Sequence, residues 1–171
     1  QYGCFLILSD IIRKDAKETL DYFRKQDVQI KIISGDDPST VSAIARRCHL
    51  LDYEKYIDVS SLSDEEIKEA VEKYTIFGRV SPQQKKIMIT TLQENNHTVA
   101  MTGDGVNDVL ALKAADCSIA MASGSDAAKS ASHIVLLENN FNAMPHIVNE
   151  GRRVINNITA SASMYLIKTI F

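Results

Sequence analysis

The segment Thr102-Gly-Asp-Gly-Val-Asn-Asp108 has the spacing with the most chemical content in the 171-residue sequence. Asp104 and Asp108 are four residues apart at an expected strand-to-helix turn, so both carboxylates can point to one spot. Two carboxylates about 4 Å apart repel each other by roughly 4 kcal/mol at an effective dielectric constant of 20. Unless one is protonated, a cation must lie between them. Hard oxygen ligands with room for waters and phosphate oxygens favour Mg²⁺.

Other loops of similar composition require different spacings. In an EF-hand counted from Asp104, the glutamate of position twelve would fall at Ala115. A dinucleotide-binding fingerprint would need glycine at the position of Asp108, and a Walker loop would need Gly-Lys-Ser/Thr. Two aspartates that only cap a turn are the non-functional alternative. The complete string of seven residues favours the metal-binding interpretation.

Two further segments have residues suited to a phosphoryl group. The hydroxyl and backbone N–H groups of Ser34-Gly35-Asp36 could bind a phosphoryl oxygen, with Gly35 allowing close approach, although a plain turn explains this segment equally well. Lys85 is expected in the first turn of a helix, where a cation opposes the helix dipole at a cost of a few tenths of a kcal/mol. A solvated lysine would gain nothing there, so we expect Lys85 to neutralise a phosphate.

Short apolar runs alternate with helical segments along the chain. Runs that are apolar on both faces are typical of parallel strands buried between helices. Asp37 followed by Pro38, and the capping box of Ser63 and Glu66, mark helix starts between these runs. The expected strands are Cys4–Leu8, Val28–Ile33, Thr75–Phe77, Thr98–Met101, Ser118–Met121 and Ile134–Leu137.

This alternation predicts an α/β fold with a mostly parallel sheet flanked by helices and with right-handed crossovers. Ligands of such sheets bind beyond the carboxyl ends of the strands. Ser34–Asp36, Arg79 and Thr102–Asp108 each follow an expected strand. We therefore expect these acidic and glycine-rich residues to meet at one edge of the sheet, which is the candidate site.

The composition is that of an ordinary globular domain. Apolar residues make up 45% and charged residues 24%, which excludes disordered and collagen-like proteins. The net charge of −3 and the lack of a basic block give no reason to expect nucleic acid as a partner. Three widely spaced cysteines predict neither a disulfide framework nor a zinc cluster, and fit a reducing compartment.

The C-terminal segment differs from the rest. Residues 151–157 are polar and basic, and Ile158–Phe171 is mostly apolar. A transmembrane helix needs about 20 apolar residues, and Asn156, Asn157 and Lys168 interrupt that count. Two interpretations stay open. One is a stalk helix that begins to enter a membrane, in a segment cut from a longer chain; the other is an amphipathic helix packed on the sheet.

Together the motifs resemble the phosphorylation domain of P-type ATPases, which belong to the haloacid dehalogenase superfamily. The pattern is most similar to bacterial calcium-pump-like cation pumps. The resemblance covers nearly the whole chain and implies a Rossmann-like haloacid dehalogenase fold. The matching segments, in the family's order, are Ser9–Asp15, Ser34–Asp37, Gly78–Lys85, Met101–Asp116, Ser118–Met121 and Glu150–Asn157.

The resemblance also implies a role for each matching residue. Asp104 and Asp108 would bind Mg²⁺ and, with Lys85, form the catalytic group. The residues implied in phosphoryl binding are Ser34, Gly35, Asp36, Lys85 and Asn107. Those implied on the ATP side are Asp10 and Arg13. The parent protein would be a membrane-embedded pump that uses ATP to move a cation, with this segment on the cytoplasmic face. Residues 1–150 would be part of the phosphorylation domain, and residues 151–171 a stalk helix and the start of a membrane span.

The sequence departs from the family chiefly by omission. The family's nucleophile is the aspartate of an Asp-Lys-Thr-Gly-Thr string, which does not occur here, and Asp10 is followed by Ile11-Ile12-Arg13 instead. The nucleotide-binding domain is missing too. Smaller departures are Ser34 for threonine, Asp37 for asparagine and Ala122 for glycine. We therefore expect a sheet without its nucleophile-bearing first strand, and a chain that binds Mg²⁺ weakly and does not turn over ATP.

Two alternatives remain for the function. A soluble phosphatase of the same superfamily would need an Asp-x-Asp pair on its first strand, which Ser9-Asp10-Ile11-Ile12 lacks. A non-catalytic regulatory domain is the other alternative. If a strand is missing, the exposed sheet edge predicts lower stability or self-association of the chain.

Overall fold

The computed structural model describes residues 14–138 and 140–170. The strands in these residues form two parallel sheets. In the first sheet, β3 (Ile76–Gly78) lies between β1 (Ile32–Ile33) and β2 (Tyr56–Asp58). In the second, β5 (Cys117–Met121) lies between β4 (Ala100–Gly103) and β6 (Ile134–Leu136). All of these strand pairs are parallel, so the predicted α/β fold with parallel strands is confirmed.

Helices connect successive strands, as the right-handed crossovers of such a fold require. They are α1 (Lys14–Lys25), α2 (Pro38–Arg47), α3 (Asp64–Lys73), α4 (Pro82–Glu94), the 3₁₀ turn η1 (Val106–Asp108), α5 (Val109–Ala114), α6 (Asp126–Ala131) and α7 (Ala143–Ile170).

The predicted helix starts are confirmed. The carboxylate of Asp37 accepts a hydrogen bond from the N–H of Ser39 at 3.0 Å, with Pro38 in the first helical position of α2. Ser63 and Glu66 form the expected capping box at the start of α3. Each cap satisfies N–H groups that have no partner inside the helix.

One apolar layer joins the two sheets. Phe77 of β3 and Met101 of β4 belong to the same buried cluster. Helices α3, α4 and α5 contribute Ile67, Met88 and Leu112 to it, and all three side chains are fully buried. Burying a side chain of this size contributes about 1.5–3 kcal/mol. The shared layer therefore holds the two sheets in one domain.

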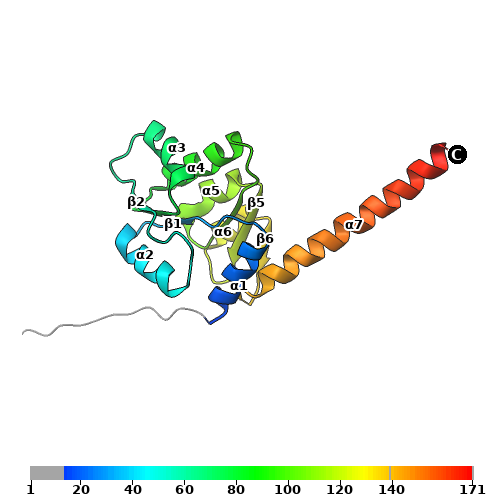
Figure 1. The fold of residues 1–171 in the computed structure, drawn as a ribbon, viewed down its shortest axis with the longest axis horizontal. Helices are drawn as coiled ribbons and strands as arrows, with labels where there is room; N and C mark the ends of the chain where they lie inside the picture. The colour runs from blue at the N-terminus through cyan, green and yellow to red at the C-terminus, as the bar shows by residue number, and fades with distance from the viewer. Residues whose placement is uncertain (1–13, 139, 171) are drawn as a thin grey trace, which may run out of the picture.

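The opposite faces of the sheets have separate covers. Ile76 points away from its neighbour Phe77, as alternate strand residues must, and packs with α2. In the second sheet, Met121 packs with Met144 of α7 and Phe23 of α1. Figure 1 shows the resulting layers, with α3 and α4 on one side of the strands and α1 and α2 on the other.

Several strand predictions need correction. Tyr56–Asp58 was not expected as a strand, because its run is short and follows a polar segment. The first described strand begins at Ile32 rather than Val28, and Leu137 lies outside β6 with 83% of its surface exposed. The expected strand Cys4–Leu8 lies outside the described residues.

Each sheet has one edge that faces the middle of the domain. In Figure 1, β2 and β6 lie on the outer sides, so β1 and β4 are the inner strands. Within the described part of the chain, β1 pairs only with β3, and β4 only with β5. The expected single sheet is therefore divided between β1 and β4.

Helix α7 projects from the domain (Figure 1). Only its first turns contact the sheet, through Met144 and Ile147. Residues 149–170 are exposed throughout, so the alternative of an amphipathic helix packed on the sheet is wrong for these residues. The helix runs without interruption through the expected boundary after residue 150.

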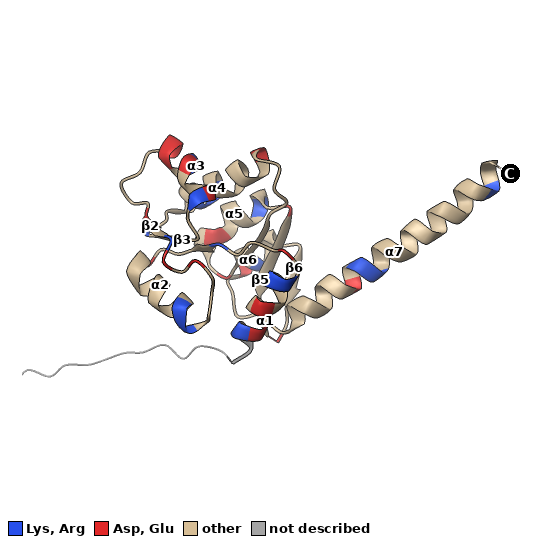
Figure 2. Cartoon of the chain, in the orientation of Figure 1, with Lys and Arg blue, Asp and Glu red and all other residues tan. Residues whose placement is uncertain are grey.

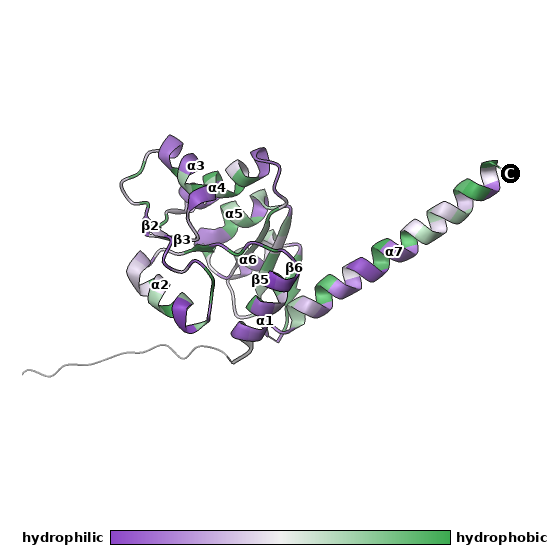
Figure 3. Cartoon of the chain, in the orientation of Figure 1, coloured by the Kyte–Doolittle hydropathy of each residue, from purple (hydrophilic) through white to green (hydrophobic). Residues whose placement is uncertain are grey.

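The far half of α7 has few charges. Its charged residues gather near its middle and at its end (Figure 2), and apolar and polar positions are mixed along it (Figure 3). Exposed apolar residues include Ile158, Leu166 and Ile170. None of the helices within residues 14–138 and 140–170 combines the length and the hydropathy needed to cross a bilayer.

Gly78 tests the packing of β3 against α2. A Cβ atom at this position would lie 2.5 Å from Cδ of Pro38, so Gly78→Ala should lower the free energy of unfolding in urea by about 1–3 kcal/mol. Gly151→Ala is the matched control, because a Cβ there meets no atom within 4 Å. Its free energy of unfolding should stay unchanged or rise by up to about 1 kcal/mol. Equal stabilities of the two variants would contradict the packing.

Candidate active site

A buried ion pair lies where the two sheets' carboxyl ends meet. Nζ of Lys85 contacts Oδ1 of Asp108 at 2.6 Å, and each side chain is 11% exposed. Oδ2 of Asp108 accepts a hydrogen bond from the N–H of Gly105 at 3.2 Å. Both carboxylate oxygens of Asp108 are thus engaged. Asp108 therefore has the ammonium group of Lys85 as a cationic partner.

The local sequence explains how this pair forms. Ser81 and Gln84 make a capping box around Pro82, which places Lys85 in the first turn of α4. At the other partner, a Cβ on Gly103 would lie 2.7 Å from Cβ of Asp108. Only glycine therefore lets Asp108 fold back over the end of β4.

Asp104 has the opposite environment. Its side chain is exposed and has no hydrogen bond or ion pair with any residue in the described part of the chain. Asn107 is exposed in the same way. Asp104 is fixed through its backbone, because its carbonyl oxygen accepts from the N–H of Ser125 at 2.8 Å.

The donor set at this edge suits Mg²⁺. Asp104 offers an exposed carboxylate with no partner among the described residues. Mg²⁺ is usually bound through one or two carboxylates plus waters and substrate phosphates. No group of three or more His, Cys, Asp or Glu side chains that could hold a metal ion occurs within residues 14–138 and 140–170. A complete cage made by the described side chains is thus not present, and a site shared with solvent and phosphate fits the residues.

The loop of Ser34–Asp36, called the Ser34 loop below, is held by the loop after β3. The N–H of Val80 donates to the carbonyl oxygen of Ser34 at 3.0 Å, and that of Arg79 to Asp36 at 2.8 Å. The hydroxyl of Ser34 donates to the carboxylate of Asp36 at 3.0 Å. Gly35 is exposed, with open space around it. The loop is therefore a formed turn whose glycine backbone is accessible.

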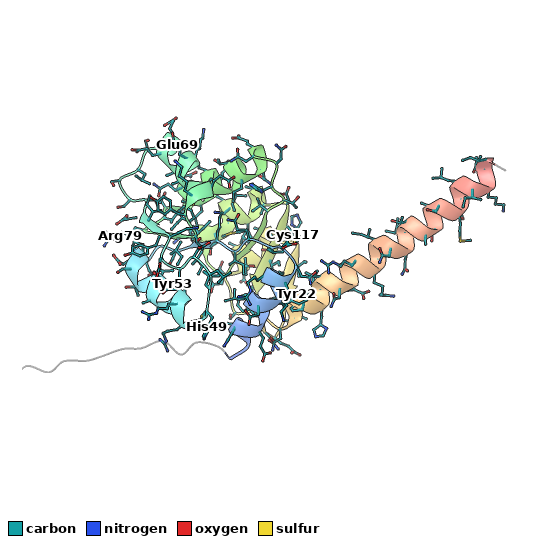
Figure 4. The ribbon with its side chains drawn as sticks, viewed as in Figure 1. Tyr22, His49, Tyr53, Glu69, Arg79 and Cys117 are labelled. Carbon is teal, nitrogen blue, oxygen red and sulfur yellow. The ribbon has the colours of Figure 1, made fainter. Side chains whose placement is uncertain are left out.

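Arg79 is a residue whose role the sequence did not reveal. Its backbone is left-handed (φ 55°), which is uncommon for a residue with a side chain. Its guanidinium group bridges Asp37 at 2.9 Å and Asp58 at 2.8 Å, thereby joining the start of α2 to the end of β2. Figure 4 labels Arg79 at the left of the domain. No spacing in the sequence indicates such a bridge.

The two carboxylates of this bridge are also held by serines. Hydrogen bonds from the hydroxyl and N–H of Ser39, followed by the charge of Arg79, lower the pKa of Asp37 from its ordinary value. Ser60 and Arg79 lower the pKa of Asp58 in the same way. Both groups are therefore more stable as carboxylates in the folded chain than in the unfolded one.

The structure thus joins some of the predicted site residues directly. Lys85 and Asp108 are in contact, and the Ser34 loop is bonded to the segment that leads into the helix of Lys85. Asp104 and Asn107 stay without side-chain partners among the described residues. Asp10 and Arg13, predicted on the ATP side, lie outside the described residues.

Comparison with known proteins identifies the family. The family model of haloacid dehalogenase-like hydrolases matches residues 1–116. The chain belongs to the haloacid dehalogenase-like hydrolase family.

Relatives of this haloacid dehalogenase-like chain include annotated ion pumps. It is 55% identical over 166 residues to the probable cation-transporting ATPase exp7 of Streptococcus pneumoniae, covering 97% of this chain and 21% of that protein. It is 49% identical over 168 residues to the calcium-transporting ATPase CtpE of Mycobacterium tuberculosis, with the same two coverages. The chain thus spans about one fifth of the length of these relatives.

A solved structure agrees with these relatives. A zinc-transporting PIB-type ATPase in its E2·Pi state matches 89% of this haloacid dehalogenase-like chain and 21% of its own, with a TM-score of 0.71 and 26% identity. The resemblance to P-type ATPases therefore holds for both the sequence and the fold.

The Lys85–Asp108 pair makes a prediction about stability. Lys85→Met leaves a buried carboxylate without its cation and should lower the free energy of unfolding by about 3–5 kcal/mol. Adding Asp108→Asn removes that charge while keeping an acceptor for Gly105, and should restore much of the loss. Urea unfolding of both single variants and the double variant measures the coupling. Additive effects would show that the pair does not interact as described.

The Arg79 bridge makes a prediction about pH. Because folding lowers the pKa of Asp37, its carboxylate stabilises the fold above the pKa of the unfolded chain, about 4. This contribution is lost as the pH falls through the lower pKa of the folded state. Asp37→Asn keeps a helix-capping oxygen but not the charge. The stability difference between wild type and Asp37→Asn in urea should be present at pH 7 and shrink below about pH 4. A difference that is constant with pH would contradict this.

Proposed function

We propose that the chain forms the Mg²⁺- and phosphoryl-binding part of the phosphorylation domain of a P-type, cation-transporting ATPase. The observation that carries the proposal is the buried Lys85–Asp108 pair together with the exposed Asp104, whose side chain has no partner among the described residues, at the carboxyl ends of parallel strands. Similarity to annotated cation-transporting ATPases over 97% of the chain supports it.

In this proposal Lys85 supplies a fixed positive charge to the phosphoryl group. Asp108 orients the ammonium group through their contact at 2.6 Å. A phosphoryl oxygen that enters the site can share the Nζ protons with Asp108, and the low exposure of both groups strengthens that attraction. Lys85 thereby contributes positioning and charge neutralisation, which are the main needs of phosphoryl transfer.

Asp104 is the residue that would hold Mg²⁺. A bound Mg²⁺ supplies charge neutralisation of phosphate oxygens. Gly35 and the N–H groups behind it offer donors for a phosphoryl oxygen, and Asn107 offers an exposed amide at the same edge. Asp36 orients the hydroxyl of Ser34 through their mutual hydrogen bonds.

The acceptor of the phosphoryl group would be an aspartate outside this chain. The divided sheet supports this, because within residues 14–138 and 140–170 no strand pairs with the inner edge of β1 or of β4, and a further parallel strand could pair there. A strand placed there would end beside Ser34 and Asp104. The chain by itself would then lack the nucleophile and have no ATPase activity.

The remaining parts of the proposal concern the parent protein. ATP would be its substrate and a cation its cargo, and this segment would lie on the cytoplasmic face of the membrane. Helix α7 would be a stalk that leads towards the membrane, in keeping with the exposure of residues 149–170.

Phosphoenzyme formation by the full-length protein tests the proposal. Asp104→Ala should reduce labelling by radioactive ATP to background, because the site loses its metal ligand. Asp126→Ala is the matched control, since that side chain is 97% exposed and its ion-pair partner is Lys129 on the same helix, α6. Labelling should stay near the wild-type level. The 171-residue chain alone should show no ATP turnover. Near-normal labelling of Asp104→Ala, or ATPase activity of the chain alone, would overturn the proposal.

A further inference from the structure

The turn after β5 packs against the backbone of Asp104. The N–H of Gly124 donates to the carbonyl oxygen of Met121 at 2.9 Å, which closes the turn. The next N–H, that of Ser125, donates to the carbonyl oxygen of Asp104 at 2.8 Å. One backbone hydrogen bond thus connects this turn to the residue whose side chain has no partner in the described part of the chain.

Gly124 is in contact with the same residue. A Cβ atom on Gly124 would lie 2.9 Å from the carbonyl oxygen and 3.0 Å from Cα of Asp104, and 3.0 Å from the carbonyl oxygen of Met121. All three are backbone atoms, which cannot swing away as the end of a flexible side chain can. Any side chain at position 124 would therefore displace the backbone of Asp104 or open the turn.

The backbone of Asp104 is confined on its other side as well. Its neighbour Gly103 lies against the side chain of Asp108, which the ion pair with Lys85 holds in place. Because its side chain has no partner among residues 14–138 and 140–170, the carboxylate of Asp104 takes its direction from a backbone held at these two points. One of these points is the hydrogen bond from the turn after β5, and the other is the contact of Gly103 with Asp108.

We propose that Gly124 and Ser125 are positioning residues that orient Asp104 as a ligand for a divalent cation. This inference rests on the proposed function, which gives Asp104 its role. Gly124 leaves the space that the backbone of Asp104 occupies, and the N–H of Ser125 holds that backbone in place. Groups that orient a metal ligand typically change metal affinity by 10- to 100-fold when removed.

Ser125 allows its two roles to be separated. Its hydroxyl oxygen caps α6 by accepting from the N–H of Ala128 at 3.1 Å, whereas its N–H binds Asp104. Ser125→Ala removes the cap and keeps the N–H. Ser125→Pro removes both, and the backbone angle φ of −62° at this position suits the proline ring. The difference between these two variants isolates the hydrogen bond to Asp104.

The experiment is an NMR titration of the 171-residue chain with MgCl₂, followed through backbone amide shifts. Ser125→Pro and Gly124→Ala should each raise the Kd for Mg²⁺ about tenfold. Ser125→Ala should stay within about twofold of the wild type, because it keeps the N–H that donates to Asp104. The helix control Gly151→Ala should do the same, because a Cβ at position 151 meets no atom within 4 Å. A wild-type Kd in Ser125→Pro or Gly124→Ala, or an equal rise in Ser125→Ala, would overturn the inference.

Two further measurements complete the test. In the full-length protein, Gly124→Ala should raise the Mg²⁺ concentration for half-maximal phosphoenzyme, and saturating Mg²⁺ should restore the level. A loss that saturating Mg²⁺ does not restore indicates general disruption and overturns the inference even where Ser125→Pro does not fold.

Asp104→Asn in the chain tests the proposed function separately. If it binds Mg²⁺ like the wild type, the role of Asp104 fails; if only Asp104→Asn loses binding, the positioning role alone fails.

Discussion

A lysine and an aspartate are each costly to bury, and in this domain Lys85 and Asp108 are buried together. Either charge alone would lose several kcal/mol of hydration free energy, whereas the contact between Nζ and Oδ1 offsets much of that loss. Because Lys85 follows the first sheet and Asp108 follows the second, their pairing also fixes how the two halves meet. The glycine at 103 and the N–H of Gly105 belong to the same arrangement, since they make room and supply a donor for the aspartate.

The site therefore has two kinds of residue. The Lys85–Asp108 pair is held in place by α4, η1 and the apolar layer beneath them. Asp104, by contrast, is held through its backbone, and its exposed carboxylate has no partner in the part of the chain that the structure describes. Such a division suits phosphoryl chemistry, in which a fixed charge awaits the phosphate and a solvated carboxylate takes up a metal ion. The Ser34 loop is an intermediate case, because its turn is formed while Gly35 stays accessible.

The sequence could predict what depends on local pattern. Apolar runs and caps such as Asp37–Pro38 gave the parallel α/β fold, and the Thr102–Asp108 string indicated a site at the strand ends. The partner of Asp108 could not be predicted, because the contact with Lys85 joins residues 23 positions apart. The same holds for Arg79, whose two aspartates are 42 and 21 positions away. Strand β2 was missed because Tyr56-Ile57-Asp58 is not an apolar run, and its place depends on pairing with β3.

The long helix α7 has a mechanical consequence. Among the described residues, it is held near its base by the packing of Met144 and Ile147 and by a hydrogen bond from Tyr22 of α1 to Asn149, while Thr19 of α1 donates to Asn142 just before the helix. A tilt at the base would therefore be carried along its whole length. Its 28 residues span about 42 Å, so a tilt of about 5° at the base moves the far end by about 4 Å. The base packs on Met121, whose carbonyl oxygen closes the turn that bears on Asp104. A small tilt of α7 where it packs on the core would thus move its C-terminal end by almost the distance between two neighbouring strands.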